Sequence, residues 1–127
     1  MKKKYLGIDY GDKRIGLALA EESSIALPFK ILDNSNNLID EIKNIVKQES
    51  INMVVIGLPH SFSGKPNERL TITENFVDLL KKNLAIEIAT VDEQLTSKLY
   101  EKMGVKKDID KHSATAILET YLTQLNV

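Results

Sequence analysis

The sequence predicts an α/β fold built on a mixed five-stranded sheet, with three antiparallel strands followed by two parallel strands and helices on the faces. Two observations predict this class. Three strand-like segments follow one another at the start of the chain, and the apolar residues then change from alternation to helical spacing. Two later apolar runs are each reached through a helical segment, and such crossovers join parallel neighbours.

The first three strands are predicted close together near the N-terminus. Tyr5–Tyr10 and Ile15–Ala20 are apolar runs, and the turn Gly11-Asp12-Lys13-Arg14 joins them in a hairpin pattern. Ile25–Leu32 is predicted as the third strand. Pro28 lies within it and indicates an edge position, because proline cannot donate a hydrogen bond to the ladder.

A helix and a buried strand are predicted next. The helix follows the polar segment Asp33–Asn37, which can cap its start. Its apolar residues recur at helical spacing and are Leu38, Ile39, Ile42, Ile45 and Val46. Met53–Gly57 is an unbroken apolar run of strand length, which is typical of a strand covered on both faces.

The remainder of the chain is predicted to hold the fifth strand and three more helices. A loop over Leu58–Lys65 leads to Pro66, which suits the first position of a helix with the apolar stripe Leu70, Phe76, Val77 and Leu80. Ile86–Val91 is the fifth strand, followed by a short helix over about Leu95 to Met103. The last helix starts near Asp110 and is expected to turn these residues inward: Ala114, Ile117, Leu118, Tyr121 and Leu122.

This order of elements, βββαβαβαα, is that of the ribonuclease H-like fold, and we expect residues 1–127 to form one domain of that class. The chain has no cysteine, which excludes disulfides, thiolate catalysis and Cys-based zinc sites. Its formal net charge of -1 means that any nucleic-acid binding must come from a local basic patch. We find no membrane-spanning segment or signal peptide, so a cytoplasmic protein is the simplest interpretation.

Acidic residues far apart in the sequence are expected to meet at one edge of this sheet. Asp9 ends the first strand, the pair Asp92-Glu93 follows the fifth, and Asp110 begins the last helix. The first, fourth and fifth strands should lie side by side with their C-terminal ends together, where ligands of open α/β sheets collect. An unpaired buried carboxylate is costly, so Asp9 in particular needs a cation or hydrogen bonds.

Such a group of carboxylates favours a hard divalent cation. Neighbouring carboxylates repel one another, and oxygen ligands without cysteine select Mg²⁺ or Mn²⁺ rather than zinc. Two such ions roughly 4 Å apart would activate a water and stabilise the leaving oxygen in phosphodiester hydrolysis. The pattern therefore predicts a metal-dependent nuclease.

Each acidic residue also has a purely structural explanation. Asp9 could bond backbone amides in the turn, although Gly7 leaves room on the same face of the strand. Asp92 is favoured as the N-cap of the helix that follows, and Glu93 could complement the dipole of that helix. Strand alternation alone does not choose between these two neighbours. Asp110 could be an N-cap and still offer its second oxygen to a metal.

Basic and hydroxyl side chains lie in the same regions of the sequence. They occur in the first turn, in the loop after the fourth strand and around Asp110. Clusters of this kind are usually solvated, but beside a metal site they could hold the phosphates that flank the scissile bond. The candidates for contacts with a nucleic-acid backbone are Lys13, Arg14, Ser63, Lys65, Lys106, Lys107 and Lys111.

Four ordered motifs give the chain a family resemblance. The segments GIDYGDKRIGLA, VVIGLP with the glycine-bearing loop after it, VDEQLTS and IDKHSATAILETYL resemble the motif blocks of the YqgF/RuvX family, over nearly the whole chain. Members of this family are similar to small Holliday-junction resolvases of the ribonuclease H-like fold. The family is regarded as the bacterial nuclease that helps to mature the 5′ end of 16S ribosomal RNA.

The resemblance implies metal binding by Asp9, Glu93 and Asp110, with Asp92 as a support. In the mechanism that we expect, Asp9 would bridge two Mg²⁺ or Mn²⁺ ions while Glu93 and Asp110 would each hold one. The expected partner is precursor 16S rRNA, and we expect the protein to act as a monomer or a weak homodimer. The chain departs from the family pattern at Gln94, at Phe62-Ser63 and at Glu74, so details of substrate binding differ while the metal ligands are retained.

Three other functions share features with this sequence. A resolvase acting on branched DNA would use the same carboxylates and would work as a dimer. A non-catalytic RNA-binding factor for ribosome assembly would not need them. The first motif also resembles the phosphate-binding hairpin of actin-like ATPases and sugar kinases, but those proteins close two domains over a nucleotide, and Pro59 and Pro66 interrupt any phosphate-binding loop around Gly64-Lys65.

Overall fold

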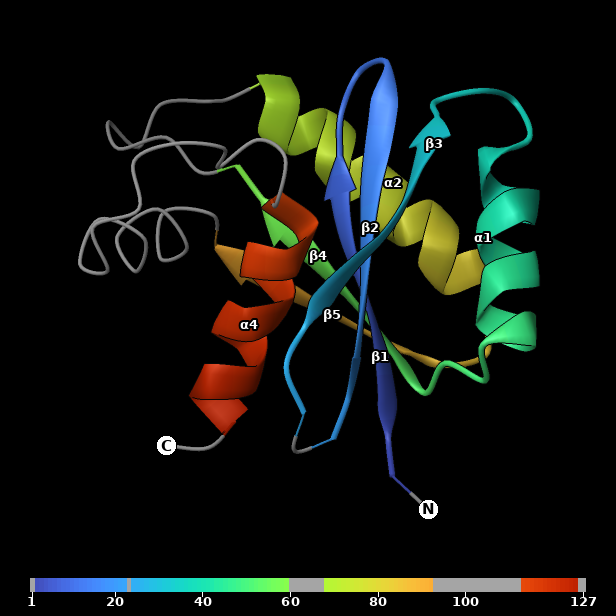
Figure 1. Ribbon diagram of the computed structural model, residues 1–127. Coiled ribbons are helices and arrows are strands. Elements are labelled where there is room, and N and C mark those ends of the chain that lie inside the picture. The colour runs from blue at the N-terminus through green and yellow to red at the C-terminus, as the bar shows by residue number, and fades with distance from the viewer. Residues whose placement is uncertain (1, 23, 60–67, 93–112, 126–127) are drawn as a thin grey trace.

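The computed structural model describes residues 2–22, 24–59, 68–92 and 113–125, which form a sheet with helices on both faces (Figure 1). The elements in chain order are β1 (Lys4–Tyr10), β2 (Arg14–Glu21), β3 (Leu27–Asp33), α1 (Leu38–Gln48), β4 (Met53–Leu58), α2 (Glu68–Asn83), β5 (Glu87–Asp92) and α4 (Ser113–Leu125).

The five strands lie in the order β3-β2-β1-β4-β5. The pairs β1–β2 and β2–β3 are antiparallel, and β1–β4 and β4–β5 are parallel, so the predicted mixed sheet is confirmed. The predicted edge position of the third strand is also confirmed, and Pro28 pairs with Ala18 next to a register irregularity. The C-terminal ends of β1, β4 and β5 therefore lie at one edge.

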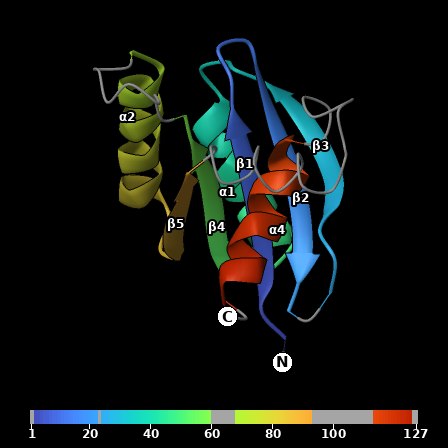
Figure 2. The ribbon, with the colours of Figure 1, turned by 90° about the vertical axis from the view of Figure 1, so that its left-hand side faces the viewer.

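Alternation along the strands divides the core into two layers. Leu6 and Ile8 of β1 pack with apolar residues of α1 and α2, whereas Tyr5 packs with Val55 of β4 and with α4. Helices α1 and α2 thus lie on one face of the sheet and α4 on the other (Figures 1 and 2). We call these the α2 face and the α4 face.

Most predicted boundaries hold to within two residues. The third strand begins at Leu27 rather than Ile25, because Glu21 and Ser24 close a turn with a 3.0 Å backbone hydrogen bond. Arg14 begins β2 and is not part of the turn, and β5 extends to Asp92.

The start of α1 differs from the prediction in its capping. Asn37 is the N-cap and makes no side-chain capping bond, since its backbone does not take the extended conformation of a capping residue. Its amide instead donates to Ser35 Oγ at 3.2 Å.

In α4 the inward face is as predicted. Ala114, Ile117 and Leu118 are buried, and Tyr121 and Leu122 pack against the same core. The predicted short helix over about 95–103, the helix start at Pro66 and most of the loop after β4 lie outside the described residues.

Candidate active site at the end of β1

Asp9 lies on the α4 face, near the C-terminal end of β1. Its neighbours Ile8 and Leu6 belong to the core under α1 and α2, so alternation turns Asp9 to the opposite side with Gly7 and Tyr5. The residue is half-buried. A polar side chain is tolerated at this point of an apolar strand because it stands at the rim of the core rather than inside it.

Two glycines let α4 approach the strands beside Asp9. A Cβ added at Gly7 would stand 2.8 Å from the carbonyl oxygen of Ala114 and 3.0 Å from Leu118 Cβ. Gly16 pairs with Asp9 across β1 and β2, and a Cβ there would be 3.8 Å from the Cβ atoms of both Ala114 and Asp9. The first turn of α4 thus lies against the strand that carries Asp9.

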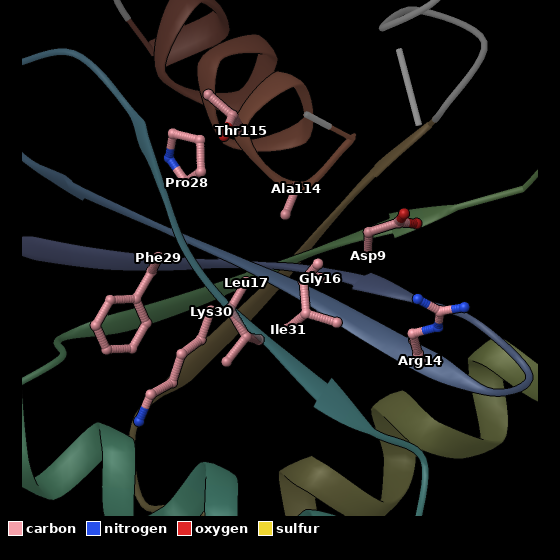
Figure 3. A pocket seen from close by; sticks show the side chains of 10 residues that line it. All are labelled: Asp9, Arg14, Gly16, Leu17, Pro28, Phe29, Lys30, Ile31, Ala114 and Thr115. Carbon is pink, nitrogen blue, oxygen red and sulfur yellow. The ribbon is translucent and has the colours of Figure 1, made fainter. Parts of the chain in front are cut away.

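A cavity of about 630 Å³ opens between this turn of α4 and the β2–β3 edge (Figure 3). Asp9 and Arg14 lie at one end of it, Gly16 forms part of its floor, and α4 contributes Ala114 and Thr115. The remaining lining residues are Leu17, Pro28, Phe29, Lys30 and Ile31.

The hairpin between β1 and β2 brings Arg14 to the same side as Asp9. The turn is tight, since a Cβ at Gly11 would meet the carbonyl oxygen of Arg14 at 2.5 Å. Asn34 holds it by donating from Nδ2 to Gly11 O and from its backbone amide to Lys13 O, both at 2.9 Å. Arg14 lines the cavity, whereas Lys13 is exposed in the turn and is not part of the lining.

Asp92 is placed on the opposite face of the sheet from Asp9. It pairs with Leu58, whose side chain packs against the core under α1 and α2, while its neighbour Val91 is buried in the core under α4. Asp92 therefore stands at the same edge as Asp9 but on the α2 face. The sequence alone left open which member of the pair Asp92-Glu93 shares a site with Asp9, and the register disfavours Asp92.

The other predicted site residues lie outside the described part of the chain. They are Glu93, Asp110, Ser63, Lys65, Lys106, Lys107 and Lys111. Among the residues that the structure describes, no three acidic, histidine or cysteine side chains come together as a metal site. Asp9 offers hard oxygen atoms beside a cavity, which fits Mg²⁺ or Mn²⁺ as one ligand of a set, and the complete set stays a prediction.

The walls of the cavity include residues that no pattern in the sequence marks as functional, namely Ile31, Pro28 and Thr115. A signal for the α4 wall does exist, since small residues alternate along one side of the hairpin at Gly16, Ala18 and Ala20 and allow a helix to pack closely.

None of the helices that the structure describes is long and apolar enough to span a membrane.

Comparison with known proteins adds family relationships to this geometry. A family profile described as "RuvX: Holliday junction resolvase" matches residues 3–124. A relative from Sulfurihydrogenibium sp. (strain YO3AOP1), named "Putative pre-16S rRNA nuclease", is 37% identical over 97% of this chain and 92% of its own length. A relative of the same name from Bacteroides fragilis is 36% identical over 94% of this chain and 95% of its own length.

Solved structures show the fold. The chain resembles T. thermophilus RuvC in complex with a Holliday junction substrate, with a TM-score of 0.71 and 12% identity over 98% of this chain and 95% of that one. It also resembles the fowlpox virus Holliday junction resolvase, with a TM-score of 0.56 and 10% identity over 95% of this chain and 99% of that one. The predicted ribonuclease H-like class is therefore confirmed.

Proposed function

The chain belongs to the RuvX family of resolvase-like nucleases, and from this premise we propose that it is a Mg²⁺- or Mn²⁺-dependent phosphodiesterase acting near the 5′ end of precursor 16S rRNA. The family supports a hydrolase that acts on nucleic acids, and the name of the relatives supports the RNA substrate. The observation that carries the proposal is the Asp9 carboxylate, which lines an open cavity together with the cation of Arg14.

Asp9, Glu93 and Asp110 are the proposed metal ligands. Asp92 lies on the α2 face, and this supports Glu93 as the member of the pair that works with Asp9. Asp110 lies outside the described residues and precedes Ser113, the first residue of α4, by three positions in the sequence.

In this proposal the chain's own residues bind and orient the substrate. Bound divalent cations would supply a water activated for attack and a charge that stabilises the leaving oxygen. The backbone that carries Asp9 is held in place because β1 is paired on both sides and α4 packs over Gly7. Arg14 offers its guanidinium to a phosphate next to the scissile bond, and Lys13 in the exposed turn offers a second, more distant cation.

The decisive variant is Asp9→Asn, with Asp12→Asn as its matched control. Asp12 is exposed in the adjacent turn, so its variant removes the same charge three residues away. Both are assayed on an end-labelled precursor 16S rRNA fragment and on a four-way DNA junction, with Mn²⁺, with Mg²⁺ and with chelator. We expect Asp9→Asn to fold as the wild type and to lose cleavage by about a hundredfold or more, and Asp12→Asn to retain it. Undiminished cleavage by Asp9→Asn excludes this site.

Arg14→Ala tests the phosphate contact. Because the side chain is exposed, the variant should unfold at the same temperature as the wild type. The dependence of RNA affinity on salt, plotted as log K against log salt concentration, should become shallower by about one unit. Lys43→Ala, which removes an exposed cation from α1 on the other face, is the control and should leave the slope unchanged.

The family description favours one other function, a resolvase for four-way DNA junctions. A resolvase cuts two strands symmetrically and needs a dimer. Paired incisions in the junction by a dimeric protein, with the RNA fragment left intact, would support this function and contradict the RNA proposal. Binding of RNA without cleavage under any metal condition would indicate an assembly factor instead.

A further inference from the structure

The cavity beside Asp9 has an apolar side that hydrolysis of a phosphodiester does not require. Ile31 of β3 is 67% exposed and lines this cavity, and Pro28 on the same strand is also exposed. Ile31 pairs with Gly16, which carries no side chain to cover it. An isoleucine left open on the floor of a cleft is a surface available to an apolar partner.

The charged groups around this floor carry information about the partner. Asp9 and Arg14 lie together at one end of the cavity (Figure 3). The Lys30 side chain points to the other face of the sheet, where its Nζ lies 5.5 Å from the centre of the Phe29 ring, so Arg14 is the cation that a ligand next to Asp9 would meet. A ligand in the cavity would therefore meet an apolar surface in the middle and a cation at one end, and a nucleotide has these two parts, a flat base and a negatively charged phosphate.

We propose that the cavity binds one unpaired nucleotide adjacent to the scissile phosphate, with its base against Ile31 and Pro28. The inference rests on the proposed nuclease function and assigns the enzyme a single-stranded segment as its substrate. The volume of about 630 Å³ is within the usual range for sites that hold a small organic ligand. A base that is paired and stacked in a duplex offers no free face to this floor, whereas an unpaired base does.

A second copy of the chain is the alternative occupant, because β3 is an edge strand with further exposed apolar residues. Ile25 is 70% exposed and Leu27 57% exposed, but both line a different cavity nearer the other end of the β2–β3 pair. The floor at Ile31 is instead continuous with Asp9 and Arg14. This continuity favours a nucleotide over a second subunit.

The test measures binding in chelator, so that it does not depend on cleavage. The probes are a fluorescein-labelled single-stranded oligouridylate of eight nucleotides and a blunt RNA duplex of the same length. The variant is Ile31→Glu. The controls are Leu79→Glu, an exposed leucine of α2 that is 47% accessible, and Ile25→Glu, which lies outside the cavity. All three substituted positions are exposed enough for the chain to fold, which thermal unfolding verifies.

We expect Ile31→Glu to weaken single-strand binding by roughly tenfold, the effect of losing one base contact, and to leave duplex binding and both controls unchanged. Photocrosslinking of 4-thiouridine in the oligomer should label the segment 28–31. Equal loss on single strand and duplex, no loss, or crosslinks only elsewhere would overturn the inference. A change of oligomeric state in Ile31→Glu would overturn it in favour of a second copy. Each of these results leaves the Asp9→Asn cleavage test intact, so the two proposals fail separately.

Discussion

Replacing Gly7 with alanine adds one methyl group where α4 and the sheet already touch. The added carbon would stand 2.8 Å from the carbonyl oxygen of Ala114, and that atom belongs to the backbone of the helix. It would also stand 3.0 Å from Leu118 Cβ, which cannot rotate away. The variant therefore has to move α4 as a unit, including the first turn beside Asp9.

The loss of stability expected for Gly7→Ala can be compared with that for the same substitution at Gly16, on the neighbouring strand. Overpacking of a well-packed core costs about 1–3 kcal/mol, so we expect Gly7→Ala to lose about 2 kcal/mol of the free energy of unfolding. For a chain of this size the unfolding midpoint should fall by roughly 6–10 °C. At Gly16 the same methyl group would meet its neighbours at 3.8 Å, an ordinary contact, so Gly16→Ala should be neutral or gain up to about 1 kcal/mol.

The assay is thermal and urea unfolding followed by circular dichroism, with both variants measured under the same conditions. Cleavage of the precursor RNA fragment by Gly7→Ala should also fall, because the helix that lies beside Asp9 is displaced. A Gly7→Ala protein as stable as the wild type would refute the close packing of α4 on β1. Equal losses of unfolding free energy in Gly7→Ala and Gly16→Ala would show that α4 does not pack more closely on Gly7 than on Gly16.

Three further predictions concern packing and charge away from the cavity. Phe76 is 5% exposed and stacks on Tyr10 with ring centres 4.2 Å apart, so Phe76→Ala should lose about 3–5 kcal/mol in urea unfolding. Burial raises the pKa of the Glu119 carboxyl above its ordinary 4.5, so its stabilising contribution is present below that pH and is lost as pH rises through the raised pKa. Glu119→Gln should therefore be more stable than the wild type at pH 8 and not at pH 4. The Lys4–Glu49 ion pair, 2.8 Å long and partly exposed, should contribute no more than about 1 kcal/mol in a double-mutant cycle and less in 1 M salt, as a surface pair does.

The fold could be predicted because its signals are local. Alternation and proline identified the edge strand β3, and the change to helical spacing identified the crossovers that make β4 and β5 parallel to β1. The start of β3 was misplaced because Ile25 is as apolar as a strand residue. Its exposure of 70% follows from the preceding turn, which hydrophobicity does not reveal.

The site was predictable only in part, because it depends on register between distant strands. The sequence located Asp9 at the end of a strand but could not determine whether Asp92 shares its face. That follows from the pairing of Leu58 with Asp92 and from the two separate cores. Ile31 lines the cavity beside Asp9 for the same kind of reason, because it pairs with Gly16 across β2 and β3. The complete ligand set is still a prediction, because Glu93 and Asp110 lie outside the described residues.

Small residues on the α4 face connect the stability of the sheet to the chemistry proposed at its edge. Gly7 of β1 and Gly16 of β2 have no side chains, and Ala114 faces them from α4. The backbone of the helix therefore comes close to the backbones of the two strands. The same absence of side chains leaves the floor next to Asp9 open. A larger residue at Gly7 would push the helix away, whereas one at Gly16 would begin to fill the cavity without displacing α4. Comparing the two alanine variants in unfolding and in single-strand binding therefore separates the packing role of this face from its role in substrate binding.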